Sequence, residues 1–490
     1  MRKQKSGQQF FTDCKTPQES IPPTLVFLVL QKINPKKTIG IMKREGFATR
    51  LGVLTATLGS AVGLGNIWKF PYMTGQNGGA AFLFIYLAAT VVVGLPIMIA
   101  EIMMGRRARA NAITTWKKVA PDNSGWMLVG VCGVLAAFSI MAFYTDVVGW
   151  VFRYIVQAAA GGLNSSDPKA AEAVFKATVS APWASLAWQW GVLALVSTII
   201  LGGVSKGIEK TTKILMPMLL GMLIVVCIRS LTLPRALDGL AFLFNPDFSK
   251  VDGEVVLMAM GLAFFKLSIG MGTMMTYGSY FREDANVPLT ASRVMLADLT
   301  VSLLAGIAIF PAVFNYGFEP AAGPGLLFMT VPAVFSSMPF GQAFMTLFFV
   351  LTAVATIGAM LSLFEVPVAF MIESGLGWSR KKATIATAVG LGICGIPATL
   401  SFSAMSDVTL FGLNFFDFYD YLSSNLLMPI GGFFICVFAG WFWGRERTEA
   451  DLSNRGALSN RAVIALYSLI VKWITPLLVL LVLLKGLGAF

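Results

Sequence analysis

Long uncharged apolar runs are the feature of this sequence that most restricts its fold. The segment 80–100, for example, contains no charged residue, and a run of about 20 apolar residues is what a helix needs to cross a hydrocarbon core of roughly 30 Å. The runs are continuous rather than alternating, which excludes a transmembrane β-barrel. Because only 13% of the residues are charged and the mean hydropathy is +0.74, we predict an all-α polytopic membrane protein.

Apolar runs of spanning length predict about eleven transmembrane helices. An odd number of spans places the two termini on opposite sides of the membrane. The segment 323–341 is short, apolar and bounded by prolines, which predicts a loop helix over the outer mouth. The predicted spans are 48–74, 79–105, 126–158, 187–202, 211–229, 255–281, 288–316, 340–374, 381–400, 411–443 and 462–487.

The net charge of +12 comes from basic residues that lie mainly in the loops between spans. They recur after every second span, at 106–118, 206–213 and 380–382. The positive-inside rule places these loops and the N-terminus in the cytoplasm, and the C-terminus outside. Because loop position explains the charge, no nucleic-acid partner is predicted.

Residues 1–41 differ from the rest, since they are polar and Lys-rich and contain no span or small-residue cleavage site. This pattern is not that of a signal peptide. We interpret the segment as a disordered tail or a mis-called start ahead of Met42, with a functional interfacial helix as the alternative. Residues 42–490 are predicted to form a single transporter domain.

No residue pattern in the sequence indicates an enzyme or a cofactor. There is no histidine, and the five cysteines are scattered without metal-ligand spacing. A nucleophile with a partnered base is also missing, so neither a metal site nor catalysis is predicted. Any proton-coupled step must therefore use a carboxylate, a lysine or a tyrosine.

Glycines interrupt two of the predicted helices, in "SAVGLGN" at 60–66 and "LSIGMGT" at 267–273. Glycine pairs such as Gly59 and Gly63 also serve helix packing, which is the alternative reading of one cluster alone. Each interruption lies in the first span of a five-helix block, however. This match predicts two inverted repeats, 48–229 and 255–443, each with one helix broken at mid-membrane, followed by an extra helix at 462–487.

The sequence resembles the neurotransmitter:sodium symporter family, especially its bacterial amino-acid transporters. The resemblance rests on "GSAVGLGNIWKFPYMTGQNGGAAFLFIY", "AFYTDVVGW", "AFFKLSIGMGTMMTYGSYF", "SLFEVPVAF" and "DYLSSNLLMPIGG", and it covers nearly everything after Met42. It implies a LeuT-like 5+5 inverted repeat with broken first and sixth helices. It also implies alternating-access transport across a bacterial inner membrane.

The resemblance further implies an amino-acid site at the two breaks. The substrate carboxylate is expected on the amides of Leu64 and Gly65 and on the Tyr144 hydroxyl. An otherwise apolar pocket with one hydroxyl suggests a neutral substrate. The implied substrate-binding residues are Ala61, Leu64, Gly65, Ile140, Tyr144, Phe265, Lys266, Ser268 and Met271.

Gates are implied on both sides of this site. On the outer side, Lys69 would pair with Asp420 or Asp417, above a lid formed by Phe265. A simple boundary salt pair is the alternative, and such pairs contribute little when exposed. The residues implied for the inner gate are Arg44, Phe47, Tyr280, Glu365 and Glu373.

The family's first sodium position departs from the pattern in two residues. Asn66 is retained, but Lys266 replaces the hydroxyl of the sixth helix and Asp298 replaces the asparagine of the seventh. An unpaired buried charge typically costs about 3–5 kcal/mol, so the two residues are interpreted as one unit. The hypothesis is that Lys266 substitutes for the ion and can contact the substrate carboxylate. The alternative is a fixed salt bridge between the helices.

The second sodium position and the chloride position are also altered. Gly358 and Ala359 stand where the family has two hydroxyls, and Thr356 could compensate only after a register shift. Tyr86 and Ser302 match the chloride site, but Leu262 does not. Sodium coupling is therefore doubtful and chloride dependence unlikely by this reading. The ion-site positions are Gly59, Ala61, Val62, Asn66, Lys266, Asp298, Ala355, Gly358 and Ala359.

Together these features predict a secondary transporter of a neutral amino acid in which Lys266, paired with Asp298, replaces the first sodium ion. Transport would then be sodium-independent or proton-linked. An ordinary sodium-coupled amino-acid symporter is the main alternative, and a non-transporting amino-acid sensor or scaffold is the second. The amino acid, the direction of flux and the oligomeric state are not fixed by the sequence.

Overall fold

The computed structural model describes residues 45–165, 167–318 and 323–489. The tail at 1–41 and Arg44 therefore lie outside the described residues. Within the described part, the regular structure is helical, apart from one isolated bridge between Leu410 and Leu413. This confirms the predicted all-α class.

Nine helices of the described residues are long and apolar enough to cross a membrane, and a bent helix pair adds a tenth. The pair of α12 and α13, which is interrupted by six residues, supplies the eleventh predicted span. These segments are α2 (Arg50–Ala61) with α3 (Phe70–Gln76), α4 (Ala80–Ala89) with α5 (Leu95–Ala108), α7 (Met127–Ala159), α9 (Pro182–Leu201), α10 (Lys210–Leu231), α12 (Gly253–Lys266) with α13 (Thr273–Gly278), α14 (Val287–Asn315), α16 (Gly341–Glu373), α17 (Arg380–Leu400), α18 (Phe415–Asp420) with α19 (Met428–Val437), and α21 (Arg461–Leu469) with α22 (Thr475–Gly486).

The first span is broken where the sequence predicts it. The helix α2 ends at Ala61, and a π-helical turn at Gly65–Lys69 leads into α3, with a bend of 51° between the two halves. Asn66 stabilises the break, because its side-chain oxygen accepts a hydrogen bond from the Gly63 amide at 3.2 Å. A side chain thus replaces a helical carbonyl as the partner of a freed backbone group.

The sixth span is broken between Lys266 and Thr273. Ser268, Gly270 and Gly272 adopt positive φ angles of 52°, 77° and 73°, a region that glycine enters without steric cost. At Gly270 a Cβ would also lie 2.3 Å from the Met428 carbonyl oxygen. The Glu101 carboxylate accepts hydrogen bonds from the amides of Gly270 (2.6 Å) and Met275 (3.3 Å), so it caps the interrupted backbone from α5.

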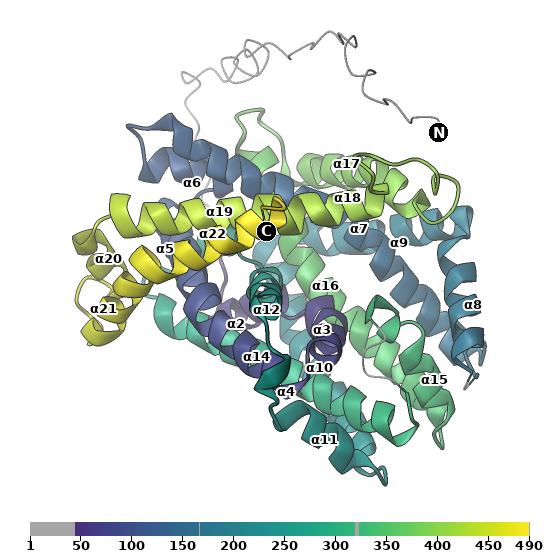
Figure 1. Cartoon of the computed structure of the whole chain (residues 1–490). Coiled ribbons are helices and arrows are strands. Elements are labelled where there is room, and N and C mark those ends of the chain that lie inside the picture. The colour runs from purple at the N-terminus through teal and green to yellow at the C-terminus, as the bar shows by residue number, and fades with distance from the viewer. Residues whose placement is uncertain (1–44, 166, 319–322, 490) are drawn as a thin grey trace, which may run out of the picture. The chain divides into compact units, whose positions relative to one another are not determined.

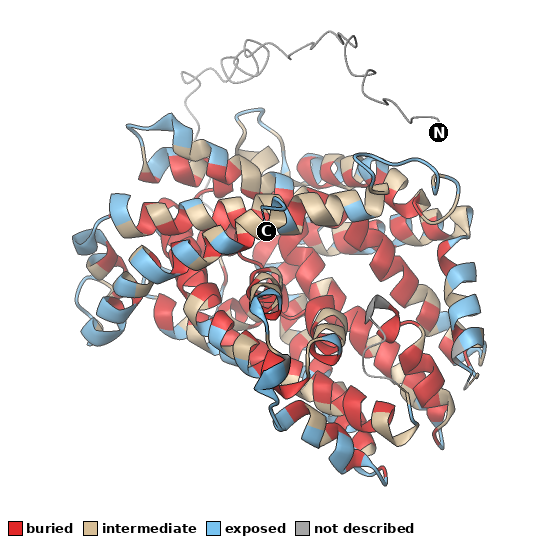
Figure 2. Ribbon diagram, in the orientation of Figure 1, coloured by how far each residue is buried: buried red, intermediate tan, exposed pale blue. Residues whose placement is uncertain are grey.

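Short helices connect the spans, and α15 lies in the loop where the sequence predicts a loop helix. They are α6 (Ala112–Val119), α8 (Pro168–Val179), α11 (Ala236–Phe244), α15 (Thr330–Ser336) and α20 (Arg445–Leu452). In Figure 1, α3 and α12 lie near the middle of the structure. Buried residues gather around them in Figure 2, whereas exposed residues predominate on α21 and are mixed with buried ones on α8, α11 and α20.

Loops rich in basic residues come together at one side of the bundle. Arg109 donates to the Phe281 carbonyl at 3.2 Å, Arg106 donates to the Ala285 carbonyl at 2.5 Å, and Arg50 pairs with Asp284 at 3.4 Å. We call this the basic side. The other side, toward which the larger cavity described below opens, is called the vestibule side.

Candidate functional site

The two helix breaks border a small cavity. All nine residues expected to bind the substrate line it, although they come from α2, α7, α12 and the two breaks. Its walls are mainly apolar, with the hydroxyls of Tyr144, Ser60 and Ser268 as the polar groups. The lining residues are Ser60, Ala61, Gly63, Leu64, Gly65, Ile140, Tyr144, Phe265, Lys266, Ser268, Met271, Ala359 and Leu363.

Hydrogen bonds hold the two breaks and α7 in register around this cavity. The Leu64 amide donates to the Tyr144 hydroxyl at 3.1 Å, and the Ser268 hydroxyl donates to the Ser60 carbonyl at 2.7 Å. Helix N-termini favour anions, and the cavity borders the turn that begins at Gly65. The arrangement therefore offers a site for a small group that carries a negative charge at one end.

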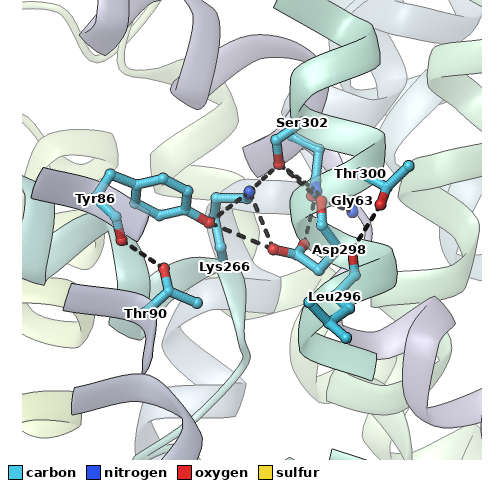
Figure 3. A network of polar contacts seen from close by, with 9 residues as sticks. Gly63, Tyr86, Thr90, Lys266, Leu296, Asp298, Thr300 and Ser302 are labelled. Carbon is cyan, nitrogen blue, oxygen red and sulfur yellow. Dashed lines mark hydrogen bonds and ion pairs between the residues drawn. The ribbon is translucent and has the colours of Figure 1, made fainter. Parts of the chain in front are cut away.

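Lys266 and Asp298 form a fully buried ion pair beside the cavity. The Lys266 Nζ lies 3.1 Å from the Asp298 Oδ2, and neither side chain is exposed. Nζ also donates to the Tyr86 hydroxyl at 2.8 Å and to the Ser302 hydroxyl. Figure 3 shows the ammonium between these three oxygens. Asn66 completes the cluster by donating to the Asp298 Oδ1 at 2.6 Å.

The Lys266 ammonium does not point into the cavity. Its stem contributes to the lining, and the Lys266 Cγ would lie 3.1 Å from a Cβ at Gly65. The charged end instead contacts Tyr86 and Ser302, the two residues that the resemblance assigned to a chloride site. The Lys266 ammonium thus contacts Asp298, which the resemblance assigns to the first sodium site, as well as the two residues that it assigns to the chloride site.

The second sodium position is narrow and poor in oxygen. A Cβ on Gly358 would lie 2.8 Å from the Gly59 carbonyl oxygen and 3.1 Å from the Met216 Cε. The Thr356 hydroxyl donates to the Ala353 carbonyl within its own helix at 2.8 Å. Gly59 and Gly358 meet here with the Met216 methyl group and the Thr212 Cγ2, and the Thr212 hydroxyl donates to the Ile208 carbonyl at 3.0 Å. Sequence reasoning missed Met216, which lies in α10, because only the packing of α10 against α2 and α16 brings it here.

On the vestibule side, a second and larger cavity adjoins the first. Leu64, Gly65, Tyr144 and Phe265 line both, so Phe265 stands between them as expected for a lid. Lys69, Asp417 and Asp420 also line this vestibule. The Lys69 Nζ lies 4.2 Å from the centre of the Phe265 ring. Among the described residues it makes no ion pair with either aspartate, so the expected outer pair is not formed in this conformation.

On the basic side, a network of charges and aromatic rings closes the route to the cavity. Glu365 accepts from the Tyr280 hydroxyl at 2.6 Å and from Arg380 at 2.8 Å. Arg380 also pairs with Glu45 at 3.1 Å. Phe47 packs against Tyr280, with ring centres 6.0 Å apart.

Three of the expected inner-gate residues thus meet, and Arg380 and Glu45 are additions that sequence reasoning missed. Glu373 accepts hydrogen bonds from both the amide and the side chain of Asn111 at 2.9 Å. In the sequence, Arg380 stands out only as a basic residue at the start of a predicted span, which is now α17. Ordinary cytoplasmic loop charges occupy the same kind of position, so the sequence did not indicate a gate residue.

Comparisons with known proteins agree with this architecture. The model of the sodium:neurotransmitter symporter family matches residues 44–169 and 179–490. Over 442 residues, the chain is 39% identical to the sodium-dependent transporter YhdH of Bacillus subtilis (strain 168); the match covers 90% of this chain and 97% of the relative. A sodium-dependent transporter of Haemophilus influenzae is 34% identical over 455 residues, with 91% and 98% covered.

A solved structure matches the fold as well. The crystal structure of MhsT in complex with L-phenylalanine has a TM-score of 0.83 and 42% sequence identity; the match covers 90% of this chain and all of that one (100%). These likenesses extend over both helix breaks and the cavity between them. They confirm the LeuT-like architecture with the first and sixth spans broken.

Proposed function

This chain belongs to the sodium:neurotransmitter symporter family, and we propose that it transports a neutral amino acid by alternating access. The cavity between the two breaks supports the proposal, since its walls are apolar and carry no unpaired charge among the described residues. The likeness to the phenylalanine complex of MhsT points to the same class of substrate. The site has no partnered nucleophile, so transport rather than catalysis fits it.

The orientation follows from the distribution of charge. The basic side faces the cytoplasm under the positive-inside rule, so the N-terminus lies inside and the C-terminus outside a bacterial inner membrane. In this orientation the vestibule opens outward, and the Arg380–Glu365 network closes the cytoplasmic route. The structure then corresponds to a conformation that receives substrate from outside.

The substrate would bind with its carboxylate at the first break. The amides of Leu64 and Gly65 and the Tyr144 hydroxyl are the proposed donors, and the positive end of the turn starting at Gly65 favours the anion. The carbonyls of Ala61 and Phe265 would accept from the amino group. Ile140, Phe265, Ser268 and Met271 would surround the side chain.

The observation that carries the mechanism is the Lys266–Asp298 pair. A sodium ion and the Lys266 ammonium carry the same charge, and Nζ already has three oxygen partners within the cluster. A second cation at this position would meet strong like-charge repulsion at low dielectric. We therefore infer that Lys266 replaces the first sodium ion and supplies the positive field behind Gly65. The Asp298 carboxylate in turn provides the negative charge that chloride would bring.

The second position supports the same conclusion. Sodium is a hard cation that favours several oxygen ligands, whereas Gly358, Ala359 and Met216 offer no side-chain oxygen there. The carbonyls of Gly59, Val62 and Ala355 remain as candidate ligands. We propose that transport is sodium-independent or linked to protons, and independent of chloride.

The test is amino-acid uptake into proteoliposomes, measured with radiolabelled neutral amino acids beginning with L-phenylalanine. Uptake should continue at an unchanged rate when choline replaces sodium, and when gluconate replaces chloride. If uptake stops without sodium, the chain is an ordinary sodium-coupled symporter, as the names of its relatives suggest.

A matched variant makes the same test sharper. Lys266→Thr combined with Asp298→Asn restores the residue types that the family uses at the first position. We expect this double variant to become partly sodium-dependent, and only partly because the second position remains poor. A double variant that transports as before, still independently of sodium, would show that Lys266 only forms a fixed salt bridge between the helices.

A further inference from the structure

One buried carboxyl group inside the membrane-spanning region has no charged partner, and the proposed mechanism does not use it. Asp146 lies in the middle of α7 and is 1% exposed. Neither carboxylate oxygen makes a hydrogen bond of regular geometry among the described residues, and its polar neighbour is the Trp150 indole N–H one turn along the helix. The other buried carboxylates within the described spans are occupied: Glu101 by two amides, Glu209 by Lys213 and Thr49, Asp298 by Lys266, and Glu365 by Arg380 and Tyr280.

Asp146 lies on the face of α7 that packs against α9 and α17. Two neighbours on that face, Ala142 and Gly149, are four and three residues away. A Cβ on Gly149 would lie 3.1 Å from the Trp188 Cβ of α9, and a Cβ on Gly395 of α17 would lie 2.7 Å from the Ala142 carbonyl oxygen. Spacings of three and four keep residues on one side of a helix, so Asp146 lies between these two contacts.

Unpartnered polar groups gather at this three-helix junction. Gln189 of α9 is fully buried, and neither of its amide atoms has a hydrogen-bond partner among the described residues. Its Nε2 lies at the α17 contact, 2.2 Å from where a Gly395 Cβ would be. The Thr399 hydroxyl, one turn from Gly395 on α17, is likewise buried without a partner. The contact between α7, α9 and α17 thus contains buried polar side chains.

No charge faces Asp146 from the elements that pack against α7. The helix α9 has no charged residue, α17 has charges only in its first three residues on the basic side, and α19 has none. The carboxylates of α16 are engaged on the basic side, and those of α18 face the vestibule. On α7 itself, Arg153 donates to the Thr178 carbonyl. The remaining titratable or charged groups on these packed elements are Lys117, Lys118, Cys132, Tyr144, Tyr154, Cys394, Tyr419, Tyr421 and Cys436.

A bare carboxylate in such a place is far less stable than a neutral carboxylic acid. Burying an ionised group without a partner costs several kcal/mol, and proteins avoid this cost by neutralising the group. A neutral acid can also donate a hydrogen bond, which an ionised carboxylate cannot. The site therefore binds a proton rather than a metal ion, for which the described residues offer no cluster of acidic or cysteine ligands.

Trp150 joins this carboxyl to the vestibule. It lies one turn along α7 from Asp146, and it lines the vestibule. Its buried indole N–H is the polar neighbour of the Asp146 carboxyl. Tyr144, a proposed substrate ligand, lies two residues from Asp146 on the same helix.

We propose that Asp146 is the proton-binding site that couples this transporter to the proton gradient. The proposal rests on the transport function above and specifies its driving ion. A proton from the vestibule binds the carboxylate while the basic side is closed, and the same proton leaves to the cytoplasm after the conformation changes. One proton, and thus one positive charge, would enter with each zwitterionic amino acid.

Infrared difference spectroscopy of the full chain in lipid tests the protonation without any substrate. At pH 7 the wild type should show the carbonyl band of a protonated carboxylic acid, and Asp146→Asn should lose it. The matched control is Asp407→Asn, which changes an exposed carboxyl and should leave the band intact. A band that survives in Asp146→Asn would overturn the proposal, even if amino-acid uptake is normal.

A transport assay then tests the proton site independently of the transport function. With a pH dye inside proteoliposomes and L-phenylalanine or another accepted amino acid outside, wild-type uptake should acidify the lumen. Asp146→Asn should lose both acidification and pH-driven accumulation but keep amino-acid exchange, which needs no net proton movement. Acidification that persists in Asp146→Asn would overturn the proposal. Wild type that shows the carboxyl band but neither exchange nor uptake of any amino acid would overturn the transport function instead.

A conservative variant covers the case in which Asp146→Asn fails to fold. Asp146→Glu keeps a titratable carboxyl in the same junction. It should retain the infrared band and lumen acidification in proportion to its uptake. Uptake by Asp146→Glu without acidification would contradict a coupling role for this carboxyl.

Discussion

Lys266 has exchanged hydration for three oxygen partners inside the bundle, and this exchange determines what the site can bind. The desolvation of two buried charges is offset only when their geometry and hydrogen bonds are good. Tyr86, Ser302 and Asn66 provide those bonds here. The pair is therefore sensitive to the loss of one member and tolerant of the loss of both.

That asymmetry gives a prediction for stability. Lys266→Met alone leaves Asp298 buried and unpaired, and should lower the free energy of unfolding by about 3–5 kcal/mol. Asp298→Asn alone should cost about as much. The double variant should recover most of the loss. Chemical unfolding in detergent, followed by tryptophan fluorescence, measures the four proteins of this cycle.

Additive losses in the double variant would show that the two charges do not act as a unit. Arg235→Ala, which breaks an exposed pair with Asp238 at 2.7 Å, is the matched control. An exposed pair contributes roughly 0–1 kcal/mol, so this control should change stability little.

The same residue scale shows where sequence reasoning succeeds. Lys266 and Asp298 were recognisable because charges in an apolar run are costly and rarely accidental. Sequence reasoning missed Asp146, although it is also a charged residue in an apolar run, because its surroundings depend on the packing of α7 against α9 and α17. The role of Arg380 also requires the fold, since its partners Glu365 and Glu45 lie in other elements.

At the scale of elements, the contact between α2 and α16 replaces the second sodium position with close packing. The predicted spans 48–74 and 340–374 contain these helices, and the glycine patterns indicated the breaks correctly. The bend of 51° in the first span and the close approach of Gly59 to Gly358 could not be predicted from the sequence, because both depend on how the helices pack. Short connecting helices such as α6 and α11 were not predicted either, because they lack the long apolar run that marks a transmembrane helix.

This packing predicts the effect of a single methyl group. Gly358→Ala places a Cβ 2.8 Å from the Gly59 carbonyl oxygen, so the helices must separate. Overpacking of this kind costs about 1–3 kcal/mol, and the melting temperature should fall. Gly221→Ala in α10 is the control, because a Cβ there meets nothing within 4 Å. It should stabilise the helix by roughly 0.5–1 kcal/mol.

The same contact predicts that restoring the family's hydroxyls will not restore the ion. Gly358→Thr with Ala359→Ser supplies two oxygens but forces α2 and α16 apart. Isothermal titration with sodium should show no gain of binding over wild type. A clear sodium signal from this variant would mean that the helices accommodate the added atoms and that two substitutions restore the second position.

At the scale of the whole molecule, the structure combines an open vestibule with a closed basic side, and Arg380 links two carboxylates on that side. It joins Glu45 before the first span to Glu365 in α16, and its side chain is 15% exposed. Arg380→Gln should therefore leave Glu365 without its cation and shift the population toward a conformation open to the basic side. Hydrogen exchange should then speed up at 45–52 and in α13, while α22 remains unchanged. Arg445→Gln, which removes only an exposed pair with Glu449, should leave both segments as in the wild type. Equal protection of α13 in Arg380→Gln and wild type would show that the aromatic contacts of Phe47 close this side by themselves.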